Sequence, residues 1–434
     1  MKKLLIYITI LFSFSVKAQE TVYPAPKQVG SIVITNATVH VGNGQVLNHA
    51  TIVITDGKIA AVGNNISIPP GSTQVNAQGK QVYPGLILPI SNLGLVEIGA
   101  VRASNDVQEL GEMNPNIHSI VAYNTDSKVI NTLRSNGILL ANVVPEGSFV
   151  AGQSSVVQLD AWNYEDASYK TDGGLHVYMP SLMARPRRGR GAGPQQPEED
   201  PVKEGLEKVD GLKSFFREAR AYYLQAAHTN TNLKFEAVQH LFDKNQKLYV
   251  HANTVKQMLV ALDFVKEFNF DVVIVGGSDS WQIADLLKQN NVSVILSTPH
   301  SLPTLGDDDV DQPYKTAAAL QKAGVLFAIS DEDGQTRGRN LPFNAGTSAA
   351  YGLTKEEALQ AITLNAAKVL GVAEKTGSIE VGKDANIIIS DGDILDMRTS
   401  QVTDAFIQGR KIDLTDKHKQ LNERYKRKYG LKDF

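Results

Sequence analysis

The sequence contains no cysteine. This absence excludes disulfide bonds, thiolate metal ligands, a thiol nucleophile and a lipid-modified cysteine. An excess of charge of one sign is also lacking: 43 basic and 46 acidic residues leave a formal charge of −3, so nothing in the composition indicates a nucleic-acid-binding protein. The 434 residues are 42% hydrophobic, which is enough for a large core that must hold the fold together without covalent cross-links.

Motifs of several enzyme classes are missing as well. The chain has no G-x-S-x-G nucleophile turn, and the segment "GQSSV" at 152–156 does not fit that pattern. It has neither a Walker A loop nor a dinucleotide-binding fingerprint. A serine hydrolase built on that turn, a P-loop nucleotidase and a nicotinamide-dependent enzyme are therefore unsupported.

Residues 1–18 differ from the rest of the chain. Lys2 and Lys3 precede an apolar run from Leu4 to Val16, and small residues lie near Ala18. This pattern predicts a secretory signal peptide cleaved near Ala18, and the apolar run is short for a membrane span, although an uncleaved anchor helix is the alternative. We expect an exported protein, periplasmic or extracellular, without an integral membrane span after cleavage.

Both ends of the remaining chain are rich in β-formers. Short Val-, Ile- and Thr-rich runs fill 31–84, with Asp56-Gly57 as a hairpin signal, and similar runs occupy 385–412 with Gly409 at a turn. These patterns predict a small composite β-sandwich domain formed by residues 19–84 and 373–413.

Between these ends, apolar strand-like runs alternate with amphipathic helical segments. This alternation over 85–372 predicts a parallel α/β fold, most economically a (β/α)8, TIM-like barrel. A Pro-, Gly- and charge-rich stretch interrupts it, and we expect a mobile insertion at about 182–212. Residues 414–434 form a basic, helical C-terminal tail.

Two segments carry a resemblance to a known family. "QVYPGLI" at 81–87 and the long run "NAGTSAAYGLTKEEALQAITLNAAKVLGVAEKTGSIEVGKDANIII" at 344–389 resemble the amidohydrolase superfamily, in particular its imidazolonepropionase-like branch. The resemblance covers about residues 30–412. It implies a metal-dependent hydrolase with a (β/α)8 barrel flanked by a small β-sandwich from both termini, in agreement with the patterns above.

The resemblance also implies where metal ligands should lie, and most of those positions are altered. The two histidines of the first barrel strand fall at Ile90 and Asn92, and the sixth-strand histidine falls near Gly276. The fifth-strand histidine is present as His251 and the eighth-strand aspartate as Asp331. One imidazole and one carboxylate make a poor zinc site, because three protein ligands plus water are the usual catalytic minimum.

Other residues near the expected strand ends could complete a site. His300 and the carboxylates of 307–311 follow the seventh strand, where a hard cation or a substrate amine is one reading and a solvated acidic loop the other. Asp279 follows Gly276-Gly277, and we interpret it mainly as a helix cap. Arg337 and Arg339 could clamp a substrate carboxylate or pair with the acidic loop.

Two functions follow from these residues. The first is a hydrolase acting on a carbon–nitrogen bond of a small amide, cyclic amide or peptide-like ligand, with no cofactor or one divalent metal ion, Asp331 as general base and His251 as ligand or electrophile. Asn92, Asp279, His300, Arg337 and Arg339 would bind substrate. The second is an inactive relative that binds a ligand, forms a homo-oligomer or pairs with an active amidohydrolase.

Overall fold

The computed structural model describes residues 22–183, 200–225, 228, 230–331 and 336–431. The expected signal peptide, residues 1–18, lies outside the described residues. Within these ranges, no helix is both long and apolar enough to cross a bilayer.

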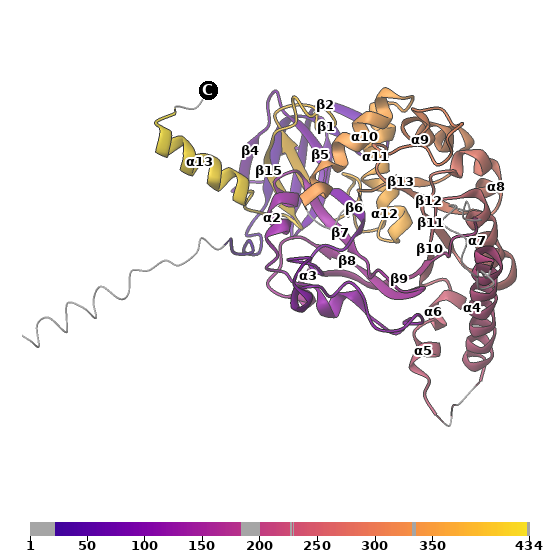
Figure 1. Cartoon of the computed structure of the whole chain (residues 1–434). Helices are drawn as coiled ribbons and strands as arrows, with labels where there is room; N and C mark the ends of the chain where they lie inside the picture. Colours follow the sequence, from indigo (N-terminus) through magenta and orange to yellow (C-terminus); the bar gives the residue numbers. More distant parts are fainter. Residues whose placement is uncertain (1–21, 184–199, 226–227, 229, 332–335, 432–434) are drawn as a thin grey trace, which may run out of the picture.

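One eight-stranded sheet curls into a nearly closed barrel at the centre of the molecule (Figure 1). In sheet order its strands are β13 (Phe327–Ile329), β12 (Ser293–Leu296), β11 (Val272–Gly276), β10 (Lys247–Ala252), β9 (Ser168–Tyr178), β8 (Val150–Gln158), β7 (Ile138–Val143) and β6 (Leu86–Ser91). The Ser330 hydroxyl donates to the Ile90 carbonyl over 3.1 Å, linking the ends of β13 and β6. The predicted barrel is confirmed.

The barrel departs from strict strand–helix alternation at one strand. β8 runs antiparallel to both β7 and β9, whereas the other neighbouring strands are parallel. Only residues 144–149 join β7 to β8, and a parallel crossover needs a dozen residues or more. The short connection therefore forces the chain to reverse at this point.

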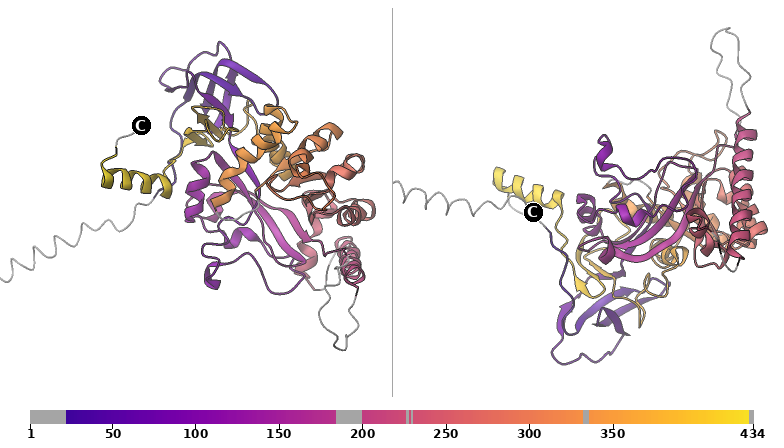
Figure 2. Two further views of the ribbon diagram at one scale, coloured as in Figure 1. Left: turned by 45° about the horizontal axis from the view of Figure 1, so that its top comes forward. Right: turned by 90° about the horizontal axis from the view of Figure 1, so that it is seen from below.

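Helices cover the outside of the barrel. They are α2 (Lys128–Arg134), α3 (Tyr164–Ala167), α4 (Pro201–Tyr223), α5 (Leu233–Glu236), α6 (Gln239–Phe242), α7 (Val255–Phe268), α8 (Ala284–Gln289), α9 (Gln312–Ala323), α10 (Leu341–Ala350), α11 (Lys355–Ala361) and α12 (Leu364–Leu370), with the 3-10 turns η1 (Arg102–Ser104), η2 (Ser119–Ala122), η3 (Ser280–Ile283) and η4 (Thr336–Asn340). α13 (Lys417–Tyr429) buries none of its residues and protrudes from the body (Figures 1 and 2).

Part of the expected mobile insertion is ordered, which corrects the prediction for 182–212. Residues 201–212 form the first half of α4, and residues 184–199 lie outside the described residues. Asp200 caps this helix by accepting from the Val202 amide, and Pro201 takes the first turn, where its missing N–H costs nothing. The side chains of Leu212 and Phe216 on this helix are buried, so the helix packs against the core.

The two ends of the chain form a second eight-stranded sheet, as expected. Its strands are β1 (Ile32–His40), β2 (Val46–Thr55), β3 (Lys58–Gly63), β4 (Thr73–Asn76) and β5 (Gln81–Pro84) from the N-terminal side, and β14 (Ile387–Ser390), β15 (Val402–Ile407) and β16 (Arg410–Lys411) from the C-terminal side. Asp56 and Gly57 both have positive φ in the β2–β3 turn, which fits the predicted hairpin. β5 pairs antiparallel with β14 and leads through Gly85 directly into β6.

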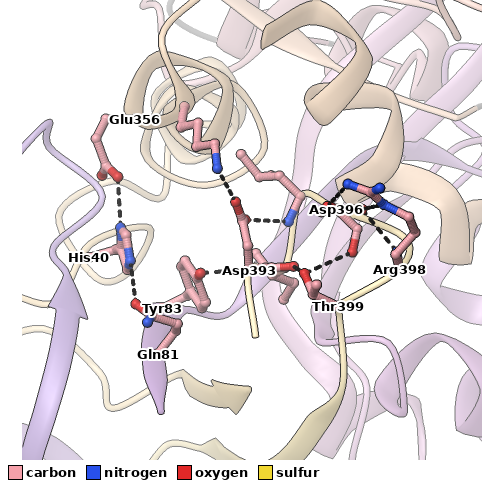
Figure 3. Close-up of polar contacts among 11 residues, drawn as sticks. His40, Gln81, Tyr83, Glu356, Asp393, Asp396, Arg398 and Thr399 are labelled. Atoms are coloured by element: carbon pink, nitrogen blue, oxygen red, sulfur yellow. Dashed lines mark hydrogen bonds and ion pairs between the residues drawn. The ribbon is translucent and has the colours of Figure 1, made fainter. Parts of the chain in front are cut away.

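A cluster of polar contacts joins this second sheet to the barrel helices (Figure 3). The His40 ring bonds to Glu356 of α11 at 2.7 Å and to Gln81 at 3.0 Å, and it stacks on Tyr83. Nearby, Lys355 pairs with Asp393. These contacts orient the terminal sheet against the helices that close the barrel.

Candidate functional site

The carboxyl ends of the parallel strands carry the expected site residues. In parallel barrels this end is where side chains from different strands converge on a ligand. His251 lies on β10, Gly276 ends β11, and Asp331 follows β13. Since β8 runs in reverse, its first residue rather than its last lies at this end.

His251 is held by a second histidine that the sequence analysis missed. Its Nε2 lies 3.0 Å from Nδ1 of His176 on β9, and the other nitrogen of His176 lies 2.9 Å from the Ser154 hydroxyl of β8. Tyr178 stacks on the His251 ring at 3.8 Å, and Tyr249 stacks on His176 at 4.7 Å. Ser154, His176 and His251 thus form a row of polar groups, and the rings of Tyr249 and Tyr178 stack on its two histidines.

Burial keeps both imidazoles neutral. It lowers the pKa of His251 to about 3 and that of His176 well below its ordinary value, with the neighbouring His251 adding to the second effect. Two sets of tautomers fit these two contacts: the bonds can run from His251 Nε2–H to His176 Nδ1 and from His176 Nε2–H to Ser154, or the other way round. In the second set the Ser154 hydroxyl donates to His176 Nε2, and His176 Nδ1–H donates to His251 Nε2. In this arrangement His251 Nδ1 carries a hydrogen, and that group bonds to none of the described residues.

Asp331 is buried, 2% exposed, and both of its oxygens are engaged. Arg337 Nε donates to Oδ1 over 2.9 Å, and Asn344 Nδ2 of α10 donates to Oδ2 over 3.1 Å. Arg337 therefore neutralises the Asp331 carboxylate. Across the part of the chain that the structure describes, no hydrogen bond or ion pair joins Asp331 to His251.

The first-strand positions hold no metal-facing pair. Ile90 is 5% exposed and packs in the barrel core. The Asn92 amide nitrogen donates to Glu146 over 3.1 Å, and its buried oxygen has no hydrogen-bond partner. Asn92 is thus tied to the loop after β7, and Glu146 is a second residue that the sequence analysis did not single out.

At the sixth strand, both the backbone conformation and a neighbouring side chain disfavour a histidine. Gly276 has φ +96°, and a Cβ placed there would lie 2.3 Å from Oδ1 of Asn253. That Asn253 oxygen also accepts from the Ser278 hydroxyl at 3.1 Å. The side chain of Asn253, just after β10, occupies the space that the side chain of the family's histidine ligand would need.

The remaining candidates are scattered. His300 bonds to Thr347 of α10 through Nε2 at 3.0 Å. Arg339 lines a pocket together with Thr132 and Asp416. The prediction that Arg339 binds substrate beside Arg337 finds no contact to support it.

Three carboxylates of the acidic loop have partners nearby. Asp309 and Asp311 pair with Lys315 of α9, at 3.4 and 2.7 Å, and Asp308 accepts from the Leu305 amide. Asp279 does not cap η3 with its side chain, so the favoured cap interpretation is wrong. The neighbouring Ser278 hydroxyl donates to Asn253.

These residues do not fit the family's metal centre. Within the described ranges, no three His, Asp or Glu side chains lie close enough together to hold an ion. The Nε2 of His251 faces a histidine, Asp331 faces an arginine, and Ile90 offers no donor atom. A zinc site needs at least three protein ligands, and the described residues bring no such set together.

Comparison with known proteins agrees with the fold. The profile of the Amidohydrolase family matches residues 207–415. The crystal structure of an amidohydrolase from Thermotoga maritima MSB8 superposes with a TM-score of 0.75 at 25% identity, covering 88% of this chain and 99% of that one. The barrel and the terminal sheet are thus shared with a protein of the same architecture.

Curated relatives match over shorter stretches. Imidazolonepropionase from Thermoplasma volcanium is 42% identical over 86 residues, which is 19% of this chain and 21% of that protein. Imidazolonepropionase from Picrophilus torridus is 32% identical over 153 residues, 34% of this chain and 36% of that protein. The matches therefore span about a fifth to a third of these relatives. Together with the fold and the family profile, they support placing the chain in the amidohydrolase superfamily, on its imidazolonepropionase-like branch.

Proposed function

We propose that this protein is an exported hydrolase acting on a carbon–nitrogen bond of a small amide or peptide-like molecule, with a site reduced from the family's metal centre. The observation that carries the proposal is the neutral His251, whose Nε2 lies 3.0 Å from His176 Nδ1 and whose own Nδ1 bonds to none of the described residues. A neutral imidazole N–H that is already oriented can stabilise the oxyanion formed when water attacks an amide carbonyl. The proposal also rests on family membership.

Asp331 supplies the carboxylate in this scheme. It keeps the family's position after β13, and its two partners fix its orientation. The carboxylate takes a proton from the attacking water, and the nitrogen of the scissile bond must gain one before it leaves. Arg337 would then either bind the substrate carboxylate or hold Asp331 in place through their 2.9 Å contact.

The test uses the mature protein and a panel of N-acyl amino acids, dipeptides and cyclic amides. We expect turnover that falls roughly 100-fold in Asp331→Asn and in His251→Phe, because each change removes one group acting on the transition state. Asp210→Asn, an exposed carboxylate change on α4, is the matched control. Absence of turnover across the panel with correctly folded protein contradicts the hydrolase.

One observation favours a second function, a ligand-binding protein or partner subunit without turnover. Both oxygens of Asp331 are engaged, and one of them faces a guanidinium. Metal content measured on protein grown in supplemented medium separates the alternatives further. Stoichiometric metal that is lost in His251→Ala or Asp331→Ala would refute an inactive relative.

A further inference from the structure

A pocket opens beside the candidate site, between the ends of β11 and β12 and the first turns of α9. The space between its atoms is about 540 Å³ when the solvent at its mouth is counted, and the room inside for a water-sized molecule is about 40 Å³. Asp279, Trp281 and Thr298 line one side, and Leu296 and Ile329 are apolar members of its wall. Asp308 of the acidic loop lines it too, so two carboxylates far apart in sequence share one pocket.

Asp279 is the feature that makes this pocket a site. The side chain is 4% exposed, and its Oδ1 is buried without a hydrogen-bond partner. Its backbone is fixed, because its N–H donates to the Asn253 carbonyl over 3.0 Å and the two preceding glycines have positive φ. The turn after β11 therefore fixes the position from which this side chain extends.

A buried carboxylate oxygen without a partner is costly, at roughly 1–3 kcal/mol for the unmet hydrogen bond alone. Native proteins seldom keep such a group unless a ligand, an ion or water meets it. The residues that line the pocket include two acids and several hydroxyls but no lysine, arginine or histidine. Among the described residues that line the pocket, none offers a cation to Asp279.

The geometry points to a binding site for a small organic primary ammonium, whose charged end meets Asp279 while its apolar body lies against Trp281, Leu296 and Ile329. A bare metal ion fits less well. Calcium takes six to eight oxygen ligands, whereas no group of three acids comes together within the described residues and much of this wall is apolar. The inference concerns binding only and holds whether or not the protein hydrolyses its ligand.

The probe pair is L-leucinamide and N-acetyl-L-leucinamide, which share the apolar body and differ in the ammonium. Binding to the full mature protein is measured by calorimetry and by the shift in unfolding temperature. We expect L-leucinamide to bind and to raise the unfolding temperature, and the acetylated probe to have at least tenfold weaker affinity. Equal effects of both probes, or no effect of either, overturn the proposal.

The variant is Asp279→Asn, which keeps the shape of the side chain and removes its charge. Its control is Asp285→Asn, six residues along the chain, an exposed aspartate of α8 outside the pocket. We expect at least a tenfold loss of L-leucinamide affinity in Asp279→Asn and none in the control. Calcium or magnesium chloride that matches the effect of the amine on the wild type would assign the pocket to a metal instead.

Discussion

The buried His176–His251 pair predicts a specific loss of stability in acid. Both rings are neutral in the folded protein, and the pKa of His251 is lowered to about 3 from its ordinary value of 6.5. The unfolded chain binds protons on these rings below pH 6.5, while the folded chain does not. The free energy of unfolding must therefore fall as pH drops from 6.5 toward 3.

The size of the effect follows from proton linkage. Each histidine that is protonated only in the unfolded state contributes about 1 kcal/mol per pH unit near pH 5.5, so the pair contributes about 2. His176 has no exposed surface and should give its full share, whereas His251 is partly exposed and gives less because solvent screens it. Carboxylates that titrate below pH 5 add their own slope, so the comparison belongs between pH 5 and 6.5.

The assay is urea unfolding at several pH values in that window. We expect the wild type to lose stability steeply and the double variant His176→Gln/His251→Gln to lose it less steeply, by between about 1 and about 2 kcal/mol per pH unit. His251→Gln alone should remove part of the slope, and His49→Gln, at an exposed position of β2, serves as the control. A double variant with the slope of the wild type would refute neutral burial of the pair.

Two further predictions concern the altered strand end and the sheet junction. Gly276→His, which restores the family's residue, should lower the free energy of unfolding by about 3 kcal/mol, because its Cβ would meet Asn253 and the backbone there has a positive φ. We also expect this variant to bind no zinc. Urea unfolding measures the first effect and metal analysis the second. At the junction in Figure 3, burial by itself lowers the pKa of His40, but hydrogen bonds to Glu356 and Gln81 and the charge of Glu356 raise it above 6.5. A raised pKa stabilises the fold below pH 6.5 and loses this effect as pH rises through the folded value, so His40→Gln should cost about 1 kcal/mol at pH 6 and less at pH 8.5; equal losses at both values would contradict this.

Local pattern was enough to predict the barrel strands and the terminal sheet. The runs that became β10, β11, β12 and β13 are short, apolar and separated by helical segments, so both their existence and their parallel order could be read from the chain. The Asp56-Gly57 turn was equally local. The reversal at β8 was missed because it depends on the length of one connection, 144–149, inside a stretch that reads as continuous strand.

The contacts within the site were harder to predict from the sequence, because they depend on the register between strands. His176 lies between Leu175 and Val177 in a run that reads only as a buried strand. It meets His251 because β9 pairs with β10 so that His176 stands opposite Tyr249 and Tyr178 opposite His251. No single strand's sequence contains that offset. Asn253 likewise matters only because the turn at Gly276 brings it close.

The pairing of β5 with β14 has a consequence for how the protein is made. Tyr83 and Ile388 are partners in this ladder although about three hundred residues separate them along the chain. During synthesis, the edge of β5 that pairs with β14 therefore stays unpaired until the whole barrel and then β14 have left the ribosome. Such long-range pairing slows folding and exposes strand edges to aggregation in the meantime. A chain with this order of contacts is suited to folding after release rather than piece by piece as it emerges.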